Sequence, residues 1–259
     1  MFEKLMEGLW RYHDETGSTS YLVVGESCAA MIDCGCVVRP LMEEIRKITP
    51  LPVKLLLTHA HPDHFGAAGS FSEVWMHEDD IDALPVFEPA FAVMGVPPIR
   101  RETLHAFKDG QVFDLGGKAI VACALPGHTP GSVVFVDEAD GLVFTGDAIG
   151  SGDIVLMSVP LAYDVSAYRA SLAAFYEKCA PWEKYTWLGG HYHQAQRGEG
   201  VAPNTPCREM VLDMIALCDA LLEGRIQGEP REEIFAPGGK AARAYLGRAG
   251  MVYSDEQVR

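Results

Sequence analysis

Basic residues are scarce in this sequence, and long apolar runs are absent. Lysine and arginine number 21 against 36 aspartates and glutamates, which gives a formal net charge of −15. Such a charge repels nucleic-acid phosphates unless a local basic groove overcomes it, and no basic run is longer than a pair such as Arg100-Arg101. No segment reaches the roughly 20 apolar residues of a membrane-spanning helix. We therefore expect neither a nucleic-acid partner nor a membrane partner.

The sequence also lacks the features of a secreted, disulfide-bonded protein. Its first residues contain no apolar segment of the kind found in a secretory signal. The seven cysteines are odd in number, and Cys34-Gly35-Cys36 has no second pair to complete a metal or redox motif. We interpret them as reduced thiols of a cytoplasmic protein. Because no repeat or linker divides the 259 residues, we predict one globular domain.

Histidines are concentrated directly after one short apolar run. The run, Val53 to Leu57, predicts a buried strand, because it is too short for a helix and follows two prolines. His59 and His61 come next in the loop. Since they are two residues apart in extended chain, their side chains point the same way and can reach one ion.

A proline then separates the first two histidines from a further pair of polar residues. Pro62 favours extended backbone before it and suits the first position of a helix. Asp63 and His64 are therefore predicted to begin a short helical turn that faces a second ion. Imidazole and carboxylate ligands favour zinc, iron or manganese.

Three more candidate ligands occur further along the chain, each in a glycine-containing turn after a short apolar run. They are His128, Asp147 and His191. A lone histidine is more often a surface residue or a hydrogen-bonded core residue than a ligand. Five histidines and two aspartates that all follow predicted strands nevertheless favour a single site with two metal ions at one edge of a β-scaffold.

At these positions the sequence resembles the metallo-β-lactamase superfamily of binuclear metallohydrolases, with the motifs in the same order from about Thr19 to His191. The resemblance implies an α+β fold, a four-layer αββα sandwich in which two mixed sheets pack face to face with helices outside. It implies one metal ion held by His59, His61 and His128, and a second held by Asp63, His64 and His191, with Asp147 bridging both. Asp33 would support the site without binding metal.

The resemblance also implies hydrolysis. Two divalent ions are expected, Zn²⁺ first, with iron or manganese as alternatives. Zinc lowers the pKa of a bound water from about 16 to about 7. A metal-bridging hydroxide would then attack a small ester, thioester or lactone, and Asp63 would orient the water and take its proton. The sequence departs from glyoxalase II at Ser132 and from the lactonases at Gly150, which stand where those proteins carry histidine and tyrosine.

Other functions remain open. A non-haem diiron oxidoreductase would use similar ligands, although the flavodiiron pattern has glutamate at the place of His61. A phosphodiesterase of the same superfamily is another alternative, although the acidic charge disfavours the nuclease branches. The bridging Asp147 disfavours a β-lactamase. A metal-dependent binding protein without catalysis is a further alternative, against which the complete ligand set argues.

Several segments are candidates for shaping the substrate site. Leu84 to Phe107 mixes apolar residues with four prolines, and it could cover the site as a lid, form a homodimer contact or pack on the body. Gly150 to Tyr163 is predicted to be a second loop over the site. Residues 205–259 are predicted to form a C-terminal helical tail, with a helix from Thr205 to Leu222. Ser166 is predicted to cap an earlier helix that runs to Cys179.

Four side chains are left as candidates for substrate contact. Tyr192 and His193 could protonate a leaving group or simply pack locally. Arg100 and Arg101 could receive an anionic substrate group if the proline-rich segment folds over the site.

Overall fold

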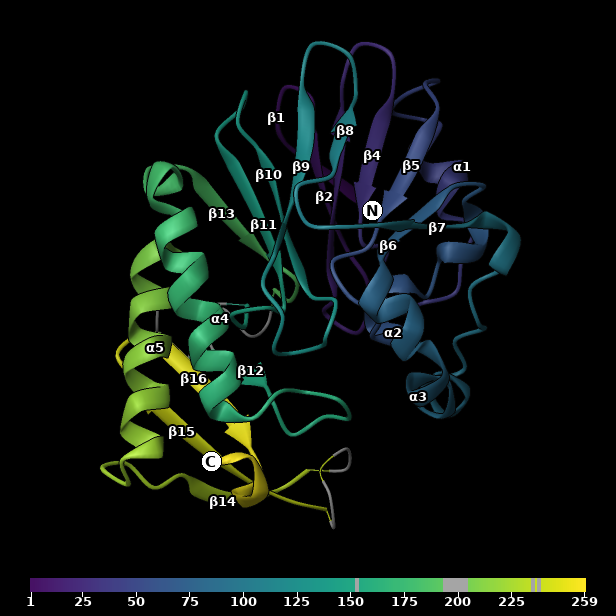
Figure 1. Cartoon of the computed structure of the whole chain (residues 1–259). Coiled ribbons are helices and arrows are strands. Elements are labelled where there is room, and N and C mark those ends of the chain that lie inside the picture. The colour runs from purple at the N-terminus through teal and green to yellow at the C-terminus, as the bar shows by residue number, and fades with distance from the viewer. Residues whose placement is uncertain (152–153, 193–204, 234–235, 237–238) are drawn as a thin grey trace.

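The computed structural model describes residues 1–151, 154–192, 205–233, 236 and 239–259. Within these residues the first sheet has seven strands in chain order (Figure 1). They are β1 (Phe2–Met6), β2 (Leu9–His13), β3 (Thr19–Val24), β4 (Ala29–Ile32), β5 (Val53–Leu56), β6 (Val74–His77) and β7 (Leu104–Phe107). Pairing is antiparallel from β1 to β4 and parallel from β4 to β7, so the sheet is mixed as expected. The sequence analysis does not predict the edge strand β1, whose side chains are largely exposed.

The second sheet has five described strands in the order β13-β11-β10-β9-β8. They are β8 (Val112–Asp114), β9 (Ala119–Ala124), β10 (Val133–Asp137), β11 (Leu142–Gly146) and β13 (Thr186–Gly189). Only the β11–β13 pair is parallel within this sheet. The turn between β10 and β11 contains Asp140 and Gly141, and Gly141 has φ +65°.

The two sheets pack face to face, with helices on both outer sides (Figure 1). Apolar side chains of both sheets, such as Ile32 and Phe135, share one buried cluster between them. A second cluster joins the first sheet to its covering helices, and a third joins the second sheet to the remaining ones. The helices are α1 (Leu41–Ile45), α2 (Pro62–Phe65), α3 (Glu78–Met94), α4 (Val165–Lys178) and α5 (Arg208–Leu222). This arrangement is the expected αββα sandwich.

The proline-containing segment differs from its prediction. The segment from Leu84 to Phe107 begins within a helix, because α3 runs from Glu78 to Met94 with Pro85 and Pro89 inside it. Both prolines are exposed, so the carbonyl groups that they cannot bond lie on the solvent side of the helix. Leu84, Phe87 and Phe91 are buried on the other side. Their helical spacing, rather than the prolines, was the informative signal.

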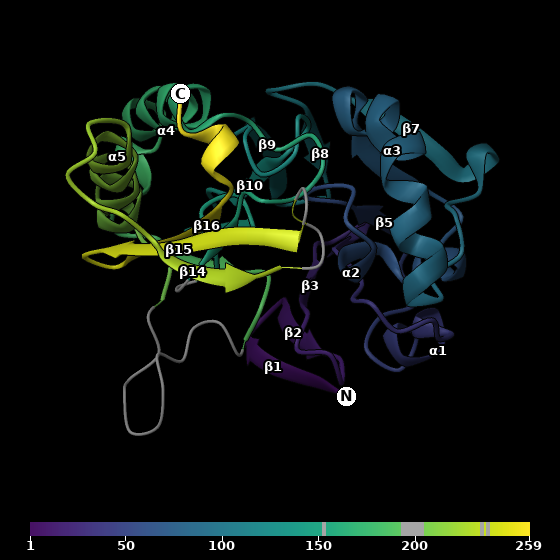
Figure 2. The ribbon, with the colours of Figure 1, turned by 90° about the horizontal axis from the view of Figure 1, so that it is seen from below.

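The C-terminal segment was only partly predicted. Helix α5 buries its apolar stripe, and Gly224, with φ +69°, follows its end as expected. The prediction of a helical tail over 205–259 is wrong beyond α5, because the chain then forms a third, four-stranded sheet (Figure 2). Its strands are β12 (Val155–Leu156), β14 (Glu229–Glu232), β15 (Lys240–Leu246) and β16 (Ala249–Tyr253). Strand β16 is fully buried and packs on α5, which explains its apolar sequence.

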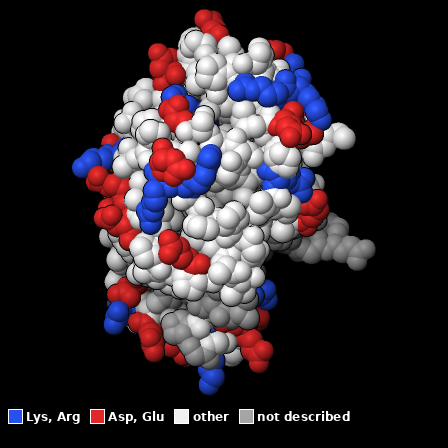
Figure 3. Space-filling model, turned by 90° about the vertical axis from the view of Figure 1, so that its right-hand side faces the viewer, with Lys and Arg blue, Asp and Glu red and all other residues white. Residues whose placement is uncertain are grey.

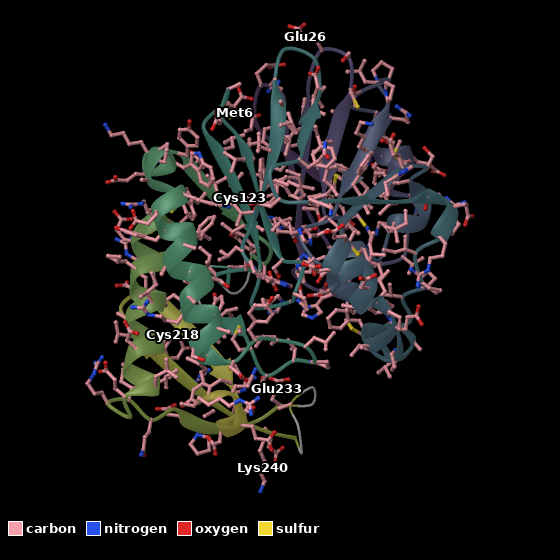
Figure 4. The ribbon with its side chains drawn as sticks, viewed as in Figure 1. Met6, Glu26, Cys123, Cys218, Glu233 and Lys240 are labelled. Atoms are coloured by element: carbon pink, nitrogen blue, oxygen red, sulfur yellow. The ribbon has the colours of Figure 1, made fainter. Side chains whose placement is uncertain are left out.

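Four smaller features of the described residues concern a helix cap, the cysteines, helix length and surface charge. The N-cap of α4 is Asp164 rather than the predicted Ser166. All seven cysteines lie in the described part of the chain and are free, and Figure 4 shows Cys123 on β9 well apart from Cys218 on α5. Among the described residues, no helix is both long enough and apolar enough to cross a bilayer. On the face shown in Figure 3, acidic and basic side chains are interspersed rather than gathered into a basic patch.

Candidate metal centre

The seven predicted ligands meet at one edge of the sandwich, where strands from both sheets end. Strand β5 leads to the first motif, β9 to His128, β11 to Asp147 and β13 to His191. Their ligand atoms form two groups, and within each group they lie no more than 4.8 Å apart. The groups are His59, His61 and His128, and Asp63, His64, Asp147 and His191. Glu26 lies at the opposite end of the sheets from α2 (Figure 4).

The local backbone of the first motif follows the prediction. His61 is extended, with φ −83° and ψ 144°, and Pro62 occupies the first turn of α2. The rings of His59 and His61 lie 4.7 Å apart, and that of His128 lies 4.8 Å from His59 and 4.5 Å from His61. Three imidazoles therefore face a common point.

These three histidines are held neutral. Burial is the largest cause that lowers their pKa, and it takes the pKa of His61 to about 3. Within the described chain, Nε2 of His59 and Nε2 of His128 are buried without a hydrogen-bond partner. Neutral imidazoles with unpaired nitrogens are the form that binds a metal ion. The residues present therefore fit a cation at this point.

In His128 and His59 the other ring nitrogen, Nδ1, has a hydrogen-bond partner that fixes the tautomer. The Nδ1 of His128 donates to the carbonyl oxygen of Leu156 at 2.7 Å, which leaves its Nε2 free to bind. The hydroxyl of Thr58 donates to Asp33 Oδ2 at 2.8 Å and lies 3.0 Å from His59 Nδ1, from which it can accept. Such bonds orient a metal-binding imidazole and raise its basicity.

The second group brings two imidazoles and two carboxylates together. His191 Nε2 lies 3.1 Å from Asp147 Oδ2, 3.2 Å from Asp63 Oδ2 and 3.3 Å from His64 Nε2. Ligands placed tetrahedrally around zinc at about 2.0–2.1 Å lie about 3.3 Å from one another. The donor atoms of this group are thus spaced to fit one divalent ion.

Electrostatics within this group favours positive charge. Burial opposes charging of His191, but Asp147 and Asp63 outweigh it and raise its pKa to about 10. Burial likewise opposes ionisation of Asp147 and Asp63, yet the neighbouring histidines hold the pKa of each carboxyl well below its usual range. Ionised carboxylates suit a divalent ion, which on binding would displace the proton that His191 holds here.

Asp147 also acts on the first group. Its charge raises the pKa of His59, His61 and His128 against the effect of burial. It therefore lies close enough to influence both groups, as the predicted bridging role requires.

Asp33 lies behind the ligands, where the sequence predicted a supporting residue. Its Oδ2 accepts a hydrogen bond from His64 Nδ1 at 2.8 Å, and its Oδ1 accepts one from the Thr58 backbone at 2.8 Å. Asp33 has a left-handed backbone, with φ +54°. Its carboxylate thus orients one ligand directly and, through Thr58, a second.

Two further supporting residues were missed by sequence reasoning. Asp80 is fully buried and accepts bonds from Ala60 N, Thr129 Oγ1 and Gly131 N at 2.6 to 2.8 Å. In the sequence it was one of three acids in the first turn of a helix, and nothing singled it out. Ser151 accepts a hydrogen bond from the His191 backbone at 2.9 Å. No sequence pattern indicated that role either.

A cavity of about 340 Å³ opens beside the two groups. Val86, Phe87, Ala90 and Met94 of α3 line one wall. This favours the alternative in which the proline-containing segment shapes the substrate pocket. Leu156, Val159 and Pro160 line another wall, so the predicted second loop does border the site. A larger cavity of about 1310 Å³ lies at the third sheet, away from both ligand groups.

Three of the four contact candidates, Arg100, Arg101 and Tyr192, do not line this cavity. Arg100 donates to the Phe71 carbonyl at 3.2 Å, and Arg101 pairs with Glu88 at 3.8 Å. Tyr192 packs its ring 4.8 Å from that of His13 and is absent from the cavity lining. The prediction for His193 lies outside the described residues.

An αββα sandwich with a histidine and aspartate centre at its strand ends defines the metallo-β-lactamase fold. The model of the metallo-beta-lactamase superfamily matches residues 13–177. This chain belongs to that superfamily.

Individual relatives agree with this assignment. A hydroxyacylglutathione hydrolase, GloC, of Haemophilus influenzae is 31% identical over 138 residues, which cover 50% of this chain and 65% of that protein. An acyl-coenzyme A thioesterase, MBLAC2, of Gallus gallus is 26% identical over 173 residues, covering 56% of this chain and 62% of that protein. The chain thus spans less than two thirds of the length of either. The structure of TTHA1623 in a di-iron-bound form matches with a TM-score of 0.56 and 28% identity, covering 68% of this chain and 87% of that one.

Proposed function

We propose that this protein is a binuclear metal-dependent hydrolase of small thioesters. The observation that carries the proposal is the convergence of five histidines and two aspartates beside an open cavity. His59, His61 and His128 would hold one ion, Asp63, His64 and His191 the other, and Asp147 would bridge them. When bound, two divalent ions would polarise the substrate carbonyl and lower the pKa of water toward neutrality.

Asp63 is the proposed proton acceptor. It lines the cavity and its side chain is 27% exposed, whereas that of Asp147 is 10% exposed. Because nearby histidines keep its pKa low, Asp63 is ionised at neutral pH, and its Oδ1, the oxygen not turned to the ion, can take a proton from water. The water oxygen forms a bond to the acyl carbon, the carbon–sulfur bond breaks, and Asp63 returns the proton to the leaving thiolate.

Two relatives support a thioester over a lactone or simple ester. Hydroxyacylglutathione and acyl-coenzyme A, named for GloC and MBLAC2, are both acyl groups joined to a thiol. A thiolate is a better leaving group than an alkoxide. Hydrolysis of a thioester therefore depends less on a general acid that protonates the leaving group. The sulfur therefore needs no dedicated acid beyond Asp63.

We propose zinc as the native metal, because imidazole and carboxylate ligands suit it. The di-iron form of TTHA1623 makes iron the specific alternative. Metal analysis of protein purified without added metal decides between them. Two zinc ions per chain support hydrolysis, whereas two irons together with oxygen consumption would favour an oxidoreductase.

The proposed function is tested by assaying metal-loaded protein on thioesters, lactones, phosphodiesters and simple esters. We expect thioester hydrolysis with measurable release of free thiol. Asp63→Asn should lower kcat by about 10²–10⁴-fold, the usual contribution of a general base. Asp82→Asn, at an exposed position on α3, is the matched control and should leave kcat unchanged. Loaded protein that hydrolyses none of the thioesters would refute the proposal.

A further inference from the structure

The cavity beside the ligands has one polar end and an apolar body. His61, Asp63 and His128 are at the polar end. Val86, Ala90 and Met94 lie one helical turn apart along α3 and form one wall. In the free protein Val86 is 47% exposed and Met94 is 40% exposed, so this wall offers water-accessible apolar surface.

The opposite side of the cavity is apolar as well. It is formed by Leu156, Val159 and Pro160, which follow the start of β12. Leu156 also accepts the hydrogen bond from His128 Nδ1, which ties this wall to the first ligand group. In Figure 1 the loop after β12 extends toward α3. An apolar channel therefore begins directly at the reacting centre.

Among the residues that the structure describes, no lysine or arginine lines this channel. Its carboxylates, Asp63 and Asp147, lie with the histidines at the polar end. Arg100 and Arg101, the nearest basic pair in the sequence, are engaged elsewhere. An anionic substrate group placed between the apolar walls would lose its hydration and find no lysine or arginine as a counter-charge. Such burial is strongly unfavourable.

We infer that the channel binds the acyl part of the substrate, and that this part is an uncharged apolar chain. The inference rests on the proposed thioesterase function. Glutathione carries carboxylates and coenzyme A carries phosphates, so neither carrier suits an apolar channel whose walls lack lysine and arginine. The acyl carbonyl lies at the ligands, its chain runs between α3 and the loop after β12, and the thiol carrier stays outside the channel.

The cavity volume sets the chain length. About 340 Å³ accommodates on the order of ten groups of ~30 Å³, the liquid volume of one water molecule. A carbonyl with a chain of roughly eight carbons fills this space. Val86, Ala90 and Met94 are thereby assigned as residues that determine specificity.

The test uses N-acetylcysteamine thioesters, whose uncharged thiol removes any contribution from the carrier. For acyl groups from acetyl to dodecanoyl, kcat/KM should rise about fourfold per methylene and level off near octanoyl. Succinyl thioester should be a poorer substrate than butanoyl thioester of equal chain length. Thioester hydrolysis that is independent of chain length, or that favours succinyl, overturns this inference and leaves the proposed function intact.

Two matched variants on α3 localise the effect. Val86→Asp places a carboxylate in the wall and should lower the ratio of octanoyl to acetyl kcat/KM by at least about tenfold. Val93→Asp makes the same change at a position that is 87% exposed and outside the channel, and should leave the ratio as in the unmodified protein. Equal ratios for the two variants would contradict the assignment of α3.

Binding provides a readout that does not depend on turnover. S-alkyl-N-acetylcysteamine thioethers cannot be hydrolysed, and calorimetry should show Kd falling about fourfold per methylene with a negative heat-capacity change. Val86→Asp should abolish this dependence on chain length. If loaded protein hydrolyses no thioester but still shows this dependence, the proposed function fails and the apolar channel stands. A Kd that is the same for all chain lengths refutes the channel.

Discussion

The carboxylate of Asp80 accepts a hydrogen bond from the hydroxyl of Thr129 at 2.8 Å, although 49 residues separate them in the chain. The same oxygen accepts from the backbone of Ala60, which lies between His59 and His61. The other oxygen accepts from the Gly131 backbone. One buried side chain therefore fixes the loop of the first motif to the loop that carries His128.

The first prediction is that Asp80→Asn weakens the first metal site without removing a ligand. The side-chain amide nitrogen of the variant cannot accept the hydrogen bond that Gly131 N donates to Asp80. The loop of the first motif and the loop that carries His128 therefore lose their fixed spacing. Zinc affinity should fall by about ten- to a hundredfold, as for other residues that orient ligands. Titration against a chromophoric chelator measures this change, and excess zinc should restore most of the activity. Asp79→Asn, next in sequence but 57% exposed, is the control and should bind zinc normally.

The second prediction concerns the pH dependence of stability. Burial raises the pKa of Asp80 from 3.8 to about 6, despite the bonds from Thr129, Gly131 and Ala60. The folded protein thus holds this proton more tightly than the unfolded chain. The associated stability is complete below about pH 4 and is lost as pH rises through 6. Asp80→Asn lacks this titration.

Denaturant unfolding of the metal-free proteins between pH 4 and pH 7 measures the effect. The free energy of unfolding of the unmodified protein, relative to Asp80→Asn, should fall by on the order of 3 kcal/mol over this range. The variant carries the same ligand residues, so their titration largely cancels in the difference. A difference that is constant with pH would contradict the predicted pKa of Asp80.

The third prediction is that Asp33→Asn reduces binding at the second metal site. His64 donates from Nδ1 to Asp33 Oδ2, which leaves Nε2 for the metal. Asparagine tolerates the left-handed backbone at this position but stabilises the imidazole less. Metal analysis after dialysis should give about one tightly bound ion per chain rather than two. Asp114→Asn, at an exposed position, should retain both ions; two tightly bound ions in Asp33→Asn would refute the assigned role.

The fourth prediction concerns the close backbone approach behind the first motif. A Cβ at Gly66 would lie 2.0 Å from the carbonyl oxygen of Cys36, and backbone atoms cannot move aside easily. Gly66→Ala should lower the free energy of unfolding by roughly 2–4 kcal/mol, as overpacking does. Gly69→Ala, where no atom lies within 4 Å of the new Cβ, is the matched control and should be neutral or slightly stabilising in thermal unfolding. Equal midpoints of thermal unfolding for Gly66→Ala and Gly69→Ala would contradict the prediction and show that the backbone at Gly66 adapts.

The predicted elements were most accurate where residue chemistry and local periodicity agreed. The apolar run from Val53 to Leu57 forms strand β5 as predicted, and Pro62 begins α2 as expected. Prolines were given too much weight at α3, where buried Leu84 and Phe87 maintain the helix. The sheet after α5 has no strong local pattern, because its strands are stabilised by packing against α5 and by pairing with the distant strand β12.

The sequence by itself indicated the seven candidate ligands, because histidines and aspartates in glycine-containing turns after apolar runs have few structural explanations; the structure brings these side chains into two groups. It also determined the short helical turn that places Asp63 and His64. Only the tertiary structure decided which residues support the ligands and what lines the cavity. Asp80, Ser151 and the apolar face of α3 act through contacts between segments far apart in the chain, and such contacts leave no periodic signal in the sequence.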